Sequence, residues 1–240
     1  MDNLFIVMPA YNEEENITTV VEQWYSMLEG MTADSCLVIA DSGSTDSTHE
    51  ILEALSEKYS QLTILSNTEK AHGPKLIALY DYAVKHGANY IFQTDSDGQT
   101  APSEFKSFWD ERNQYDAILG WRPVRGDGKA RALVEKVVCF LLKIYFGINI
   151  QDANAPFRLM NADLIKKYLY RLPTNYNLPN IILTTFFVYY DEKITFKKIS
   201  FGPRQKGTGS MSIPKIFKIG WKALGDFQKI KRDLRQMNKQ

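Results

Sequence analysis

The sequence has few cysteines, almost no net charge and no long apolar run. Its two cysteines, Cys36 and Cys139, lie within apolar stretches, and neither has the CxxC or CxxH spacing of a metal or redox site. We expect both to be reduced core residues of an intracellular protein. The formal net charge is +1, so no overall field favours nucleic acid as a partner.

The longest apolar runs are too short or too polar to cross a membrane. A spanning helix needs about 18 consecutive apolar residues, whereas residues 137–142 are followed by Lys143 and residues 181–190 include threonines. The first residues also lack the basic start and the small-residue cleavage site of a signal peptide. We therefore expect a cytoplasmic protein, either free or peripheral at the cytoplasmic face of a membrane.

The first hundred residues alternate between apolar runs and helical patterns. The apolar runs predict strands over 4–8, 36–40, 62–65 and 90–94. Apolar residues at helical spacing predict helices over about 17–28, 48–59 and 74–85. Asn12 and Glu15 suit a capping box before the first of these helices. Strands joined by such helices predict an α/β fold, with a mostly parallel central sheet flanked by helices in a single domain.

Polar clusters follow all four predicted strands. In open parallel sheets ligands bind beyond the carboxyl ends of the strands, and the clusters lie there: PAYNEEEN (9–16), DSGSTDST (41–48), NTEKAHGPK (67–75) and DSDGQ (95–99). The alternative is a set of solvated turns. Turn chemistry does not explain why each strand ends in acids or donors, so we favour a nucleotide site.

Two well-known nucleotide motifs are missing. The pattern GxxxxGK[ST] is absent, which excludes the P-loop enzymes, and GxGxxG does not follow the first strand, which disfavours a dinucleotide fold. Asp95 and Asp97 stand two positions apart at the end of the fourth predicted strand, where strand alternation would point both side chains the same way. Such a pair suits Mg²⁺ or Mn²⁺ bridging to substrate phosphates. The other interpretation is a solvated turn, because Asp, Ser and Gly all favour turns.

Six segments, taken together and in order, resemble the inverting glycosyltransferases of family 2, which have the GT-A fold and use nucleotide-diphosphate sugars. The segments are PAYNEEENI (9–17), DSGSTDST (41–48), GPKLIAL (73–79), DSDGQTAPSEF (95–105), DANAPFRLMN (152–161) and RQKGTGS (204–210). The resemblance implies a catalytic domain over residues 1–213, followed by a basic amphipathic helical extension over 214–240. Two residues depart from the family pattern: Ser42 stands where a second acid is usual, and Pro156 where a glycine is usual.

Carried over residue by residue, the resemblance implies several sets of site residues. Those implied for the nucleotide-diphosphate sugar are Pro9, Ala10, Tyr11, Glu13, Asp41, Gly73, Lys75, Asp95 and Ser96. Those implied for the metal, Mg²⁺ or Mn²⁺, are Asp95, Asp97 and Gln99. The implied catalytic residues are Asp97, Asp152 and Arg204, and those implied for an acceptor phosphate are Arg122, Arg131 and Arg204.

A second resemblance bears on the identity of the acceptor. Within the family, the sequence looks most like the polyprenyl-phosphate (dolichyl- or undecaprenyl-phosphate) sugar synthases over residues 118–136 and at Asp152, Arg158 and Arg204. That resemblance implies polyprenyl phosphate, whose oxygens arginine can bond bidentately. A hydroxyl acceptor needs a general base, and relatives that act on hydroxyls usually place a carboxylate at the start of a late helix. Residues 164–190 contain no Asp or Glu. Asp152 keeps two possible roles, as a base or as a structural carboxylate that orders the loop before Arg158.

Two segments are candidate membrane surfaces. Residues 215–240 contain eight Lys or Arg against two Asp, a balance of +6, interleaved with apolar and aromatic groups. This resembles a tail that anionic lipid would attract; the alternative is a solvated basic helix packed on its own domain. A helix predicted over about 130–146 is the second candidate. Its apolar face is expected to contain Val134, Val137, Val138, Leu141 and Leu142.

Two other functions stay open. One is a transferase that adds a sugar to a hydroxyl of a surface polysaccharide or lipopolysaccharide. The other is an inactive nucleotide-sugar-binding or scaffold module, which the departures at Ser42 and Pro156 would suit. The sequence does not name the sugar or choose between UDP and GDP.

Overall fold

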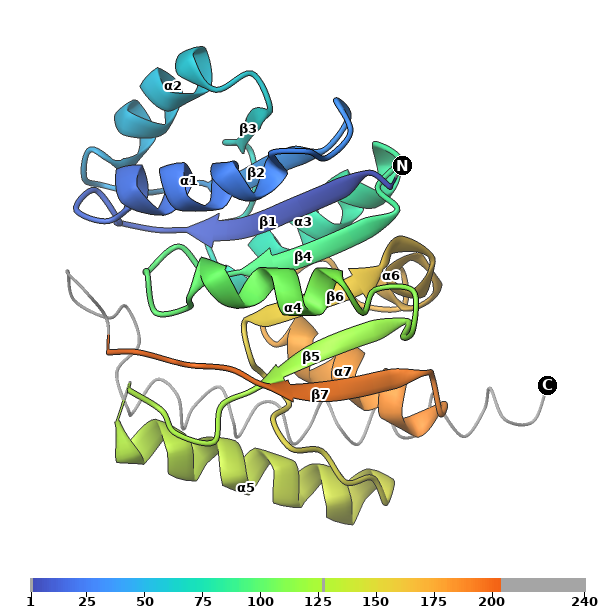
Figure 1. The fold of residues 1–240 in the computed structure, drawn as a ribbon. Coiled ribbons are helices and arrows are strands. Elements are labelled where there is room, and N and C mark those ends of the chain that lie inside the picture. The colour runs from blue at the N-terminus through green and yellow to red at the C-terminus, as the bar shows by residue number, and fades with distance from the viewer. Residues whose placement is uncertain (1, 127, 204–240) are drawn as a thin grey trace.

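The computed structural model describes residues 2–126 and 128–203. In them, seven strands form one sheet in the order β3-β2-β1-β4-β6-β5-β7 (Figure 1). The strands are β1 (Leu4–Ala10), β2 (Cys36–Asp41), β3 (Leu62–Leu65), β4 (Tyr90–Thr94), β5 (Ala117–Trp121), β6 (Phe157–Asn161) and β7 (Ile194–Lys198). The α-helices are α1 (Ile17–Tyr25), α2 (Thr48–Lys58), α3 (His72–Lys85), α4 (Phe105–Trp109), α5 (Lys129–Phe146), α6 (Ala162–Leu169) and α7 (Pro179–Tyr189), and two 3₁₀ turns are η1 (Ser26–Leu28) and η2 (Pro102–Glu104).

The sheet is mostly parallel, as predicted. β1 pairs in parallel with β2 and β4, β2 with β3, and β5 with β7. Only β6 runs antiparallel to its neighbours β4 and β5 in the described residues. The expectation of an α/β fold with a central sheet flanked by helices in a single domain is confirmed. The four predicted strands are present, whereas the sequence patterns gave no prediction for β5, β6 or β7.

Helices cover both faces of the sheet (Figure 1). The central strands are buried on both sides, as the burial of all seven residues of β1 shows, whereas the edge strands β3 and β7 are mostly only partly buried. On one face, apolar residues of α1, α2 and α4 pack with Leu4, Ile6 and Met8. On the other, residues of α3, α5, α6 and α7 pack with Phe5 and Val7. Two hydrophobic cores thus enclose the sheet.

The sheet also positions the site. From β1 the chain adds β2 and β3 on one side and β4 on the other, so the order reverses between β1 and β4. Ligands of open α/β sheets bind at such a point, beyond the carboxyl ends of the strands. Arg204 and the extension predicted over 214–240 lie outside the described residues.

Candidate functional site

The carboxyl ends of β1 and β4 are joined by buried polar contacts. Ser96 Oγ donates to the Pro9 carbonyl oxygen at 2.9 Å, and Lys75 Nζ, from α3, donates to the Ala10 carbonyl oxygen at 2.5 Å. Lys75 is only 1% exposed and its Nζ lies 5.5 Å from the centre of the Tyr11 ring. Burial lowers the pKa of Lys75, and the nearby Asp41 carboxylate opposes that change. The structure therefore brings these six predicted residues together near the point where the strand order reverses.

Gly73, beside Lys75, sits where no larger residue fits. A Cβ atom at this position would lie 2.3 Å from the Tyr176 carbonyl oxygen and 2.5 Å from the Asn177 carbonyl, closer than real Cβ contacts allow. The missing side chain lets the first turn of α3 approach the segment before α7. Gly73 thus acts through the packing that places Lys75.

The loops after β1 and β2 are tied to each other. The backbone N–H of Asn12 donates to Ser44 Oγ, while Asn12 Oδ1 accepts from the Thr45 N–H at 2.8 Å. Asn12 has a positive φ of 54° and does not cap α1, whose N-cap is Asn16. The predicted capping box is therefore wrong, because the Asn12 side chain bonds across to the second loop. Glu13 belongs to the same link, since its N–H donates to Thr48 Oγ1 at 2.8 Å.

Asp41, the last residue of β2, is buried and paired. It accepts a hydrogen bond from Ser44 Oγ, and its Oδ2 lies 3.1 Å from His49 Nδ1 of α2. Neighbouring Ser42, at the position where the family usually has an acid, contacts Thr68 Oγ1 through its hydroxyl. The predicted nucleotide residues of the first two loops thus share one hydrogen-bonded surface.

Asp95 and Asp97 lie in a turn rather than on the strand. β4 ends at Thr94, so strand alternation does not direct their side chains, contrary to the expectation. Asp97 Oδ1 accepts from the Gln99 N–H at 3.1 Å, and Gly98 has a φ of +71°. Both aspartates are partly exposed just beyond the carboxyl end of β4, where the conformation of the turn, and not strand alternation, sets the direction of their side chains.

The donor chemistry of this turn fits Mg²⁺ or Mn²⁺. These ions favour oxygen ligands and are commonly held by one or two carboxylates together with substrate phosphates and waters. Asp95 and Asp97 supply two such carboxylates. Across residues 2–126 and 128–203, no group of three or more His, Cys, Asp or Glu is placed to hold a metal, so diphosphate oxygens and waters would complete the coordination.

Gln99 connects the turn to the segment after β7. Its Nε2 donates to the Gly202 carbonyl oxygen at 2.7 Å, and the Gly202 N–H donates back to the Gln99 carbonyl oxygen at 3.0 Å. The Gly126 N–H in turn donates to the Phe201 carbonyl oxygen at 2.9 Å. The segment 201–202 therefore bridges the aspartate turn and the loop after β5 that carries Arg122.

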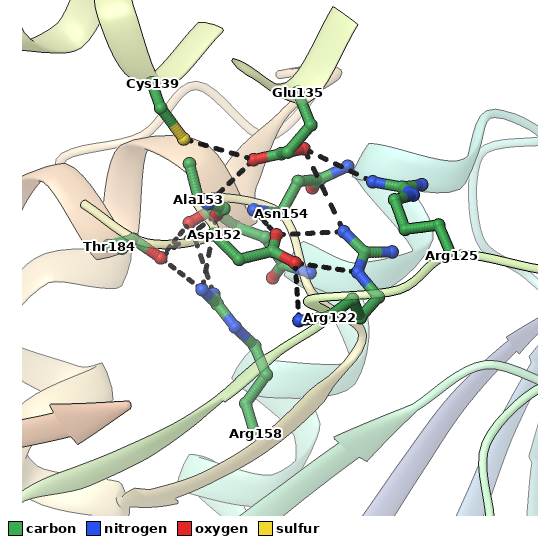
Figure 2. Close-up of polar contacts among 10 residues, drawn as sticks. Arg122, Arg125, Glu135, Cys139, Asp152, Ala153, Asn154, Arg158 and Thr184 are labelled. Carbon is green, nitrogen blue, oxygen red and sulfur yellow. Dashed lines mark hydrogen bonds and ion pairs between the residues drawn. The ribbon is translucent and has the colours of Figure 1, made fainter. Parts of the chain in front are cut away.

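Arg122 and Asp152 form a buried bidentate ion pair, shown in Figure 2. Arg122 Nε donates to Asp152 Oδ2 at 2.8 Å and Arg122 Nη2 to Asp152 Oδ1 at 2.9 Å. The two side chains are only 4% and 2% exposed. Asp152 also accepts from the Arg122 N–H and from the Asn154 N–H, so both of its oxygens are engaged by donors.

Glu135, on α5, completes this cluster. Its Oε1 accepts from the Ala153 N–H at 2.8 Å, and its Oε2 lies 3.8 Å from Arg125 Nη1 and 3.9 Å from Arg122 Nη2. Burial raises the pKa of Glu135, and repulsion from Asp152 adds to the rise. Burial of the Cys139 thiol, together with the negative charge of Glu135, raises the pKa of this thiol to about 12. The cysteine therefore stays protonated and unreactive. The sequence patterns did not single out Glu135.

A second buried network runs from Asp95 toward the same cluster. Asp95 Oδ1 accepts from Gln93 Nε2 at 3.4 Å, and Gln93 Oε1 accepts from Asn180 Nδ2 at 3.0 Å. Asn180 Oδ1 accepts from the Tyr80 hydroxyl at 2.8 Å, and the Asn180 carbonyl oxygen accepts from Arg158 Nη1 at 3.2 Å. Sequence reasoning missed this network. Its one visible signal was a glutamine inside the apolar run of β4.

Arg158 carries the network to the loop before β6. It is fully buried and donates to the Thr184 hydroxyl and, through Nη2, to the Ala153 carbonyl oxygen at 3.4 Å (Figure 2).

Arg131 lies in the first turn of α5 and is partly exposed. Within the described residues no helix is both long enough and apolar enough to cross a membrane.

Comparison with known proteins gives a consistent result. The family model described as Glycosyl transferase family 2 matches residues 5–169. Polyprenol monophosphomannose synthase of Mycolicibacterium smegmatis is 24% identical over 174 residues, 68% of this chain and 63% of that protein. Undecaprenyl-phosphate 4-deoxy-4-formamido-L-arabinose transferase of Pectobacterium carotovorum is 23% identical over 220 residues, 90% of this chain and 65% of that protein. The chain thus spans a little under two thirds of the length of these two relatives.

Solved structures show the same arrangement of helices and strands. Glucosyl-3-phosphoglycerate synthase from Mycobacterium tuberculosis, in complex with phosphoglyceric acid, superposes with a TM-score of 0.68 at 17% identity, covering 95% of this chain and 79% of that one. The same enzyme with Mn²⁺, UDP-glucose and glycerol 3-phosphate gives a TM-score of 0.65 at 16% identity, covering 91% of this chain and 76% of that one.

Proposed function

The chain belongs to glycosyl transferase family 2 and has the GT-A fold, and from this premise we propose that it transfers a sugar, with inversion, from a nucleotide-diphosphate sugar to polyprenyl phosphate. By their names, the M. smegmatis synthase acts on a polyprenol and the P. carotovorum transferase on undecaprenyl phosphate, which supports the acceptor. In the proposal the acceptor oxygen attacks the anomeric carbon, in line with the departing nucleotide diphosphate.

The donor half of the proposal rests on the carboxyl edge of β1, β2 and β4. Lys75, Ser96 and the loops after β1 and β2 form one bonded surface there, and Asp41 is fixed at its far side. We assign this surface to the nucleotide, with Pro9, Ala10, Tyr11 and Glu13 lining it. Buried, hydrogen-bonded residues hold their positions before the ligand arrives, which lowers the cost of binding.

Asp95 and Asp97, with Gln99 close by, are assigned to Mg²⁺ or Mn²⁺. When bound, the ion neutralises charge that develops on the leaving diphosphate. The protein contributes the orientation of the carboxylates, since Asp97 is fixed by the Gln99 N–H and Asp95 by Gln93.

The acceptor half rests on the charge of the cluster in Figure 2. Three guanidinium groups, of Arg122, Arg125 and Arg158, face two carboxylates, of Asp152 and Glu135, so the cluster keeps a positive excess. The raised pKa of Glu135 increases that excess whenever this carboxyl is protonated. Such a cluster suits an anionic acceptor. Arg131 and Arg204 are proposed to share the lipid phosphate with Arg122.

A phosphate acceptor also removes the need for a base. Its oxygen is already anionic, whereas a hydroxyl must lose a proton in the transition state. Asn180 stands at the start of α7, and its side chain is committed to Tyr80 and Gln93. Both oxygens of Asp152 are occupied by N–H donors. Of the two roles left open for Asp152, we therefore propose the structural one: it orders the loop and orients Arg122.

The test is donor turnover by the full chain with Mn²⁺ or Mg²⁺. UDP- and GDP-sugars are screened with and without polyprenyl phosphate, for the wild type and for Asp97→Ala. The matched control is Asp34→Ala, which removes an exposed carboxylate just before the amino end of β2, away from the site. Lipid-dependent release of nucleotide that is lost only in Asp97→Ala supports the proposal. Nucleotide release that does not depend on the lipid but requires a glycan would indicate that the acceptor is a sugar hydroxyl. Metal-independent binding without turnover leaves the scaffold function.

A further inference from the structure

Apolar side chains are exposed mainly in one part of the molecule. Seven large apolar residues are exposed in the described residues, and five of them lie on α5 or in the loop before it: Val124, Leu133, Val137, Phe140 and Ile144. The four on α5 are between 47% and 62% exposed. Their spacings of four, three and four residues place them on one face of the helix. A surface helix normally shows polar residues on that face.

This face is opposite to the one that packs on the domain. Leu142 and Phe146 are buried in the core, with Val138 and Cys139 against them, and Glu135 points into the cluster of Figure 2. The apolar face expected from the sequence is therefore partly wrong, because Val138 and Leu142 belong to the core. Figure 1 shows α5 at the lower edge of the molecule, with the other described elements above it. We call Leu133, Val137, Phe140 and Ile144 the outer face of α5.

The exposed charges of α5 beside the outer face are positive. Lys136 and Lys143 are exposed and seven residues apart, so they lie in one row along the helix. The one acidic residue of α5 is Glu135, whose side chain is only 14% exposed and points inward. The exposed side of α5 therefore combines apolar side chains with lysines. An anionic bilayer surface complements both, since apolar groups insert at the boundary while lysines extend to the headgroups.

We propose that the outer face of α5 docks the protein on an anionic lipid bilayer. The inner face of the same helix supplies Glu135 to the cluster that we assign to the acceptor phosphate. Docking through α5 would thus hold the cluster close to the plane in which a lipid phosphate lies; this consequence, though not the docking itself, rests on the proposed function.

Two other occupants fit the outer face less well. A second copy of the chain would bring the lysines of both copies together, and four side chains fall far short of the roughly 20 residues a side of a stable interface. Residues 215–240 are themselves strongly basic, so they would face Lys136 and Lys143 with like charge. Each of these occupants predicts a distinct result in the experiment below.

The experiment measures binding of the full chain to vesicles that contain no polyprenyl phosphate. Vesicles of phosphatidylcholine alone are compared with vesicles that also contain phosphatidylglycerol, by flotation. We expect binding that requires phosphatidylglycerol. In the variant Phe140→Ser with Ile144→Ser the partition coefficient should fall about tenfold for each side chain. In Lys136→Gln with Lys143→Gln it should fall about fivefold for each lysine. The matched control is Tyr170→Ser, another exposed aromatic at the end of α6, which should bind as the wild type does.

Three results would overturn the proposal. The first is a wild-type chain that does not bind the anionic vesicles. The second is binding by the Phe140→Ser, Ile144→Ser variant equal to that of the wild type, which would place the contact elsewhere, residues 215–240 included. The third is a smaller mass for this variant than for the wild type by light scattering, which would show that a second copy occupies the face. Circular dichroism checks that each variant is folded.

Turnover separates this proposal from the proposed function. The Phe140→Ser, Ile144→Ser variant should keep wild-type turnover with a short-chain polyprenyl phosphate in detergent and lose it with the long-chain lipid in vesicles. If the wild type binds anionic vesicles through α5 but turns over no lipid acceptor, docking stands and the proposed function fails.

Discussion

Asp152→Asn removes one charge from the buried ion pair with Arg122 while keeping the shape of the side chain. The two carboxylate oxygens accept four N–H groups: Arg122 N–H at 3.3 Å, Nε at 2.8 Å, Nη2 at 2.9 Å and Asn154 N–H at 3.1 Å. An amide offers one oxygen and turns its own N–H₂ toward two of these donors. Glu135, at 3.9 Å, would remain as a carboxylate beside Arg122.

Removing one partner of a buried pair costs about 3–5 kcal/mol, a large part of the roughly 5–15 kcal/mol by which domains are stable. Urea unfolding, followed by the fluorescence of buried Trp24 and by circular dichroism, measures this loss. The matched control is Asp110→Asn, which breaks the exposed pair with Lys106 at 2.7 Å and should cost less than about 0.5 kcal/mol. Replacing both partners, with Arg122→Met and Asp152→Leu, should restore much of the stability, because no buried charge is left unpaired.

The same variants separate the two roles of Asp152. If Asp152→Asn lowers stability by less than about 1 kcal/mol and instead strongly lowers turnover and changes the pH profile of what remains, the structural role is refuted and Asp152 is a base. If stability falls as expected and the remaining turnover keeps its pH dependence, Asp152 acts by holding Arg122 and the loop at residues 152–154.

Three further predictions concern single contacts. The pKa of Glu135 is raised in the folded state above its ordinary value of 4.5, so the stability that its neutral form contributes is fully present below about pH 4.5 and is lost as pH rises through the folded pKa. Glu135→Gln should remove this loss of stability with rising pH, as measured by urea unfolding from pH 4.5 upward. A pH dependence of stability equal to that of the wild type would contradict this prediction. Lys75→Met removes the hydrogen bond from Lys75 Nζ to the Ala10 carbonyl oxygen and the cation beside the Tyr11 ring. Nucleotide affinity, measured by calorimetry, should therefore fall about tenfold. An affinity equal to that of the wild type would exclude Lys75 from the site. Gly73→Ala forces a Cβ to within 2.3 Å of the Tyr176 carbonyl and should lower stability by about 1–3 kcal/mol, whereas Gly87→Ala, at a glycine with open space around it but a φ of +80°, measures the cost of backbone strain alone.

The parallel half of the fold could be predicted because its signals are local. β1 to β4 are apolar runs followed by helical spacing, and both kinds of pattern are visible within about 15 residues. β5, β6 and β7 were not predicted, because small or charged residues interrupt their apolar runs: Gly120 in β5, Arg158 in β6, and Lys197 and Lys198 in β7. The antiparallel insertion of β6 has no signature in the chain at all.

The candidate site divides in the same way. The polar clusters that contain Asp41, Lys75, Ser96 and Asp97 could be placed at one end of the sheet, because each cluster follows a recognised strand. The roles of the single residues came from the family resemblance and stay predictions. The inward direction of the Glu135 side chain could not be predicted, because helical spacing does not say which face of α5 packs against the rest of the domain. The outer face of α5 was mistaken for the same reason, since apolar residues occur on both sides of this helix.

The buried network explains why the start of α7 has no base. Asn180 Oδ1 accepts from the Tyr80 hydroxyl, whose pKa burial raises so that it remains a donor. The amide N–H₂ of Asn180 must therefore point to Gln93 Oε1, and Gln93 in turn presents its N–H₂ to Asp95. A carboxylate in place of Asn180 would accept from both neighbours and turn the Gln93 oxygen toward Asp95, where two acceptors would repel. The asparagine thus orients an aspartate assigned to the metal, and the same position cannot also supply a base without reversing that orientation. An acceptor that arrives already ionised is the one that this arrangement suits.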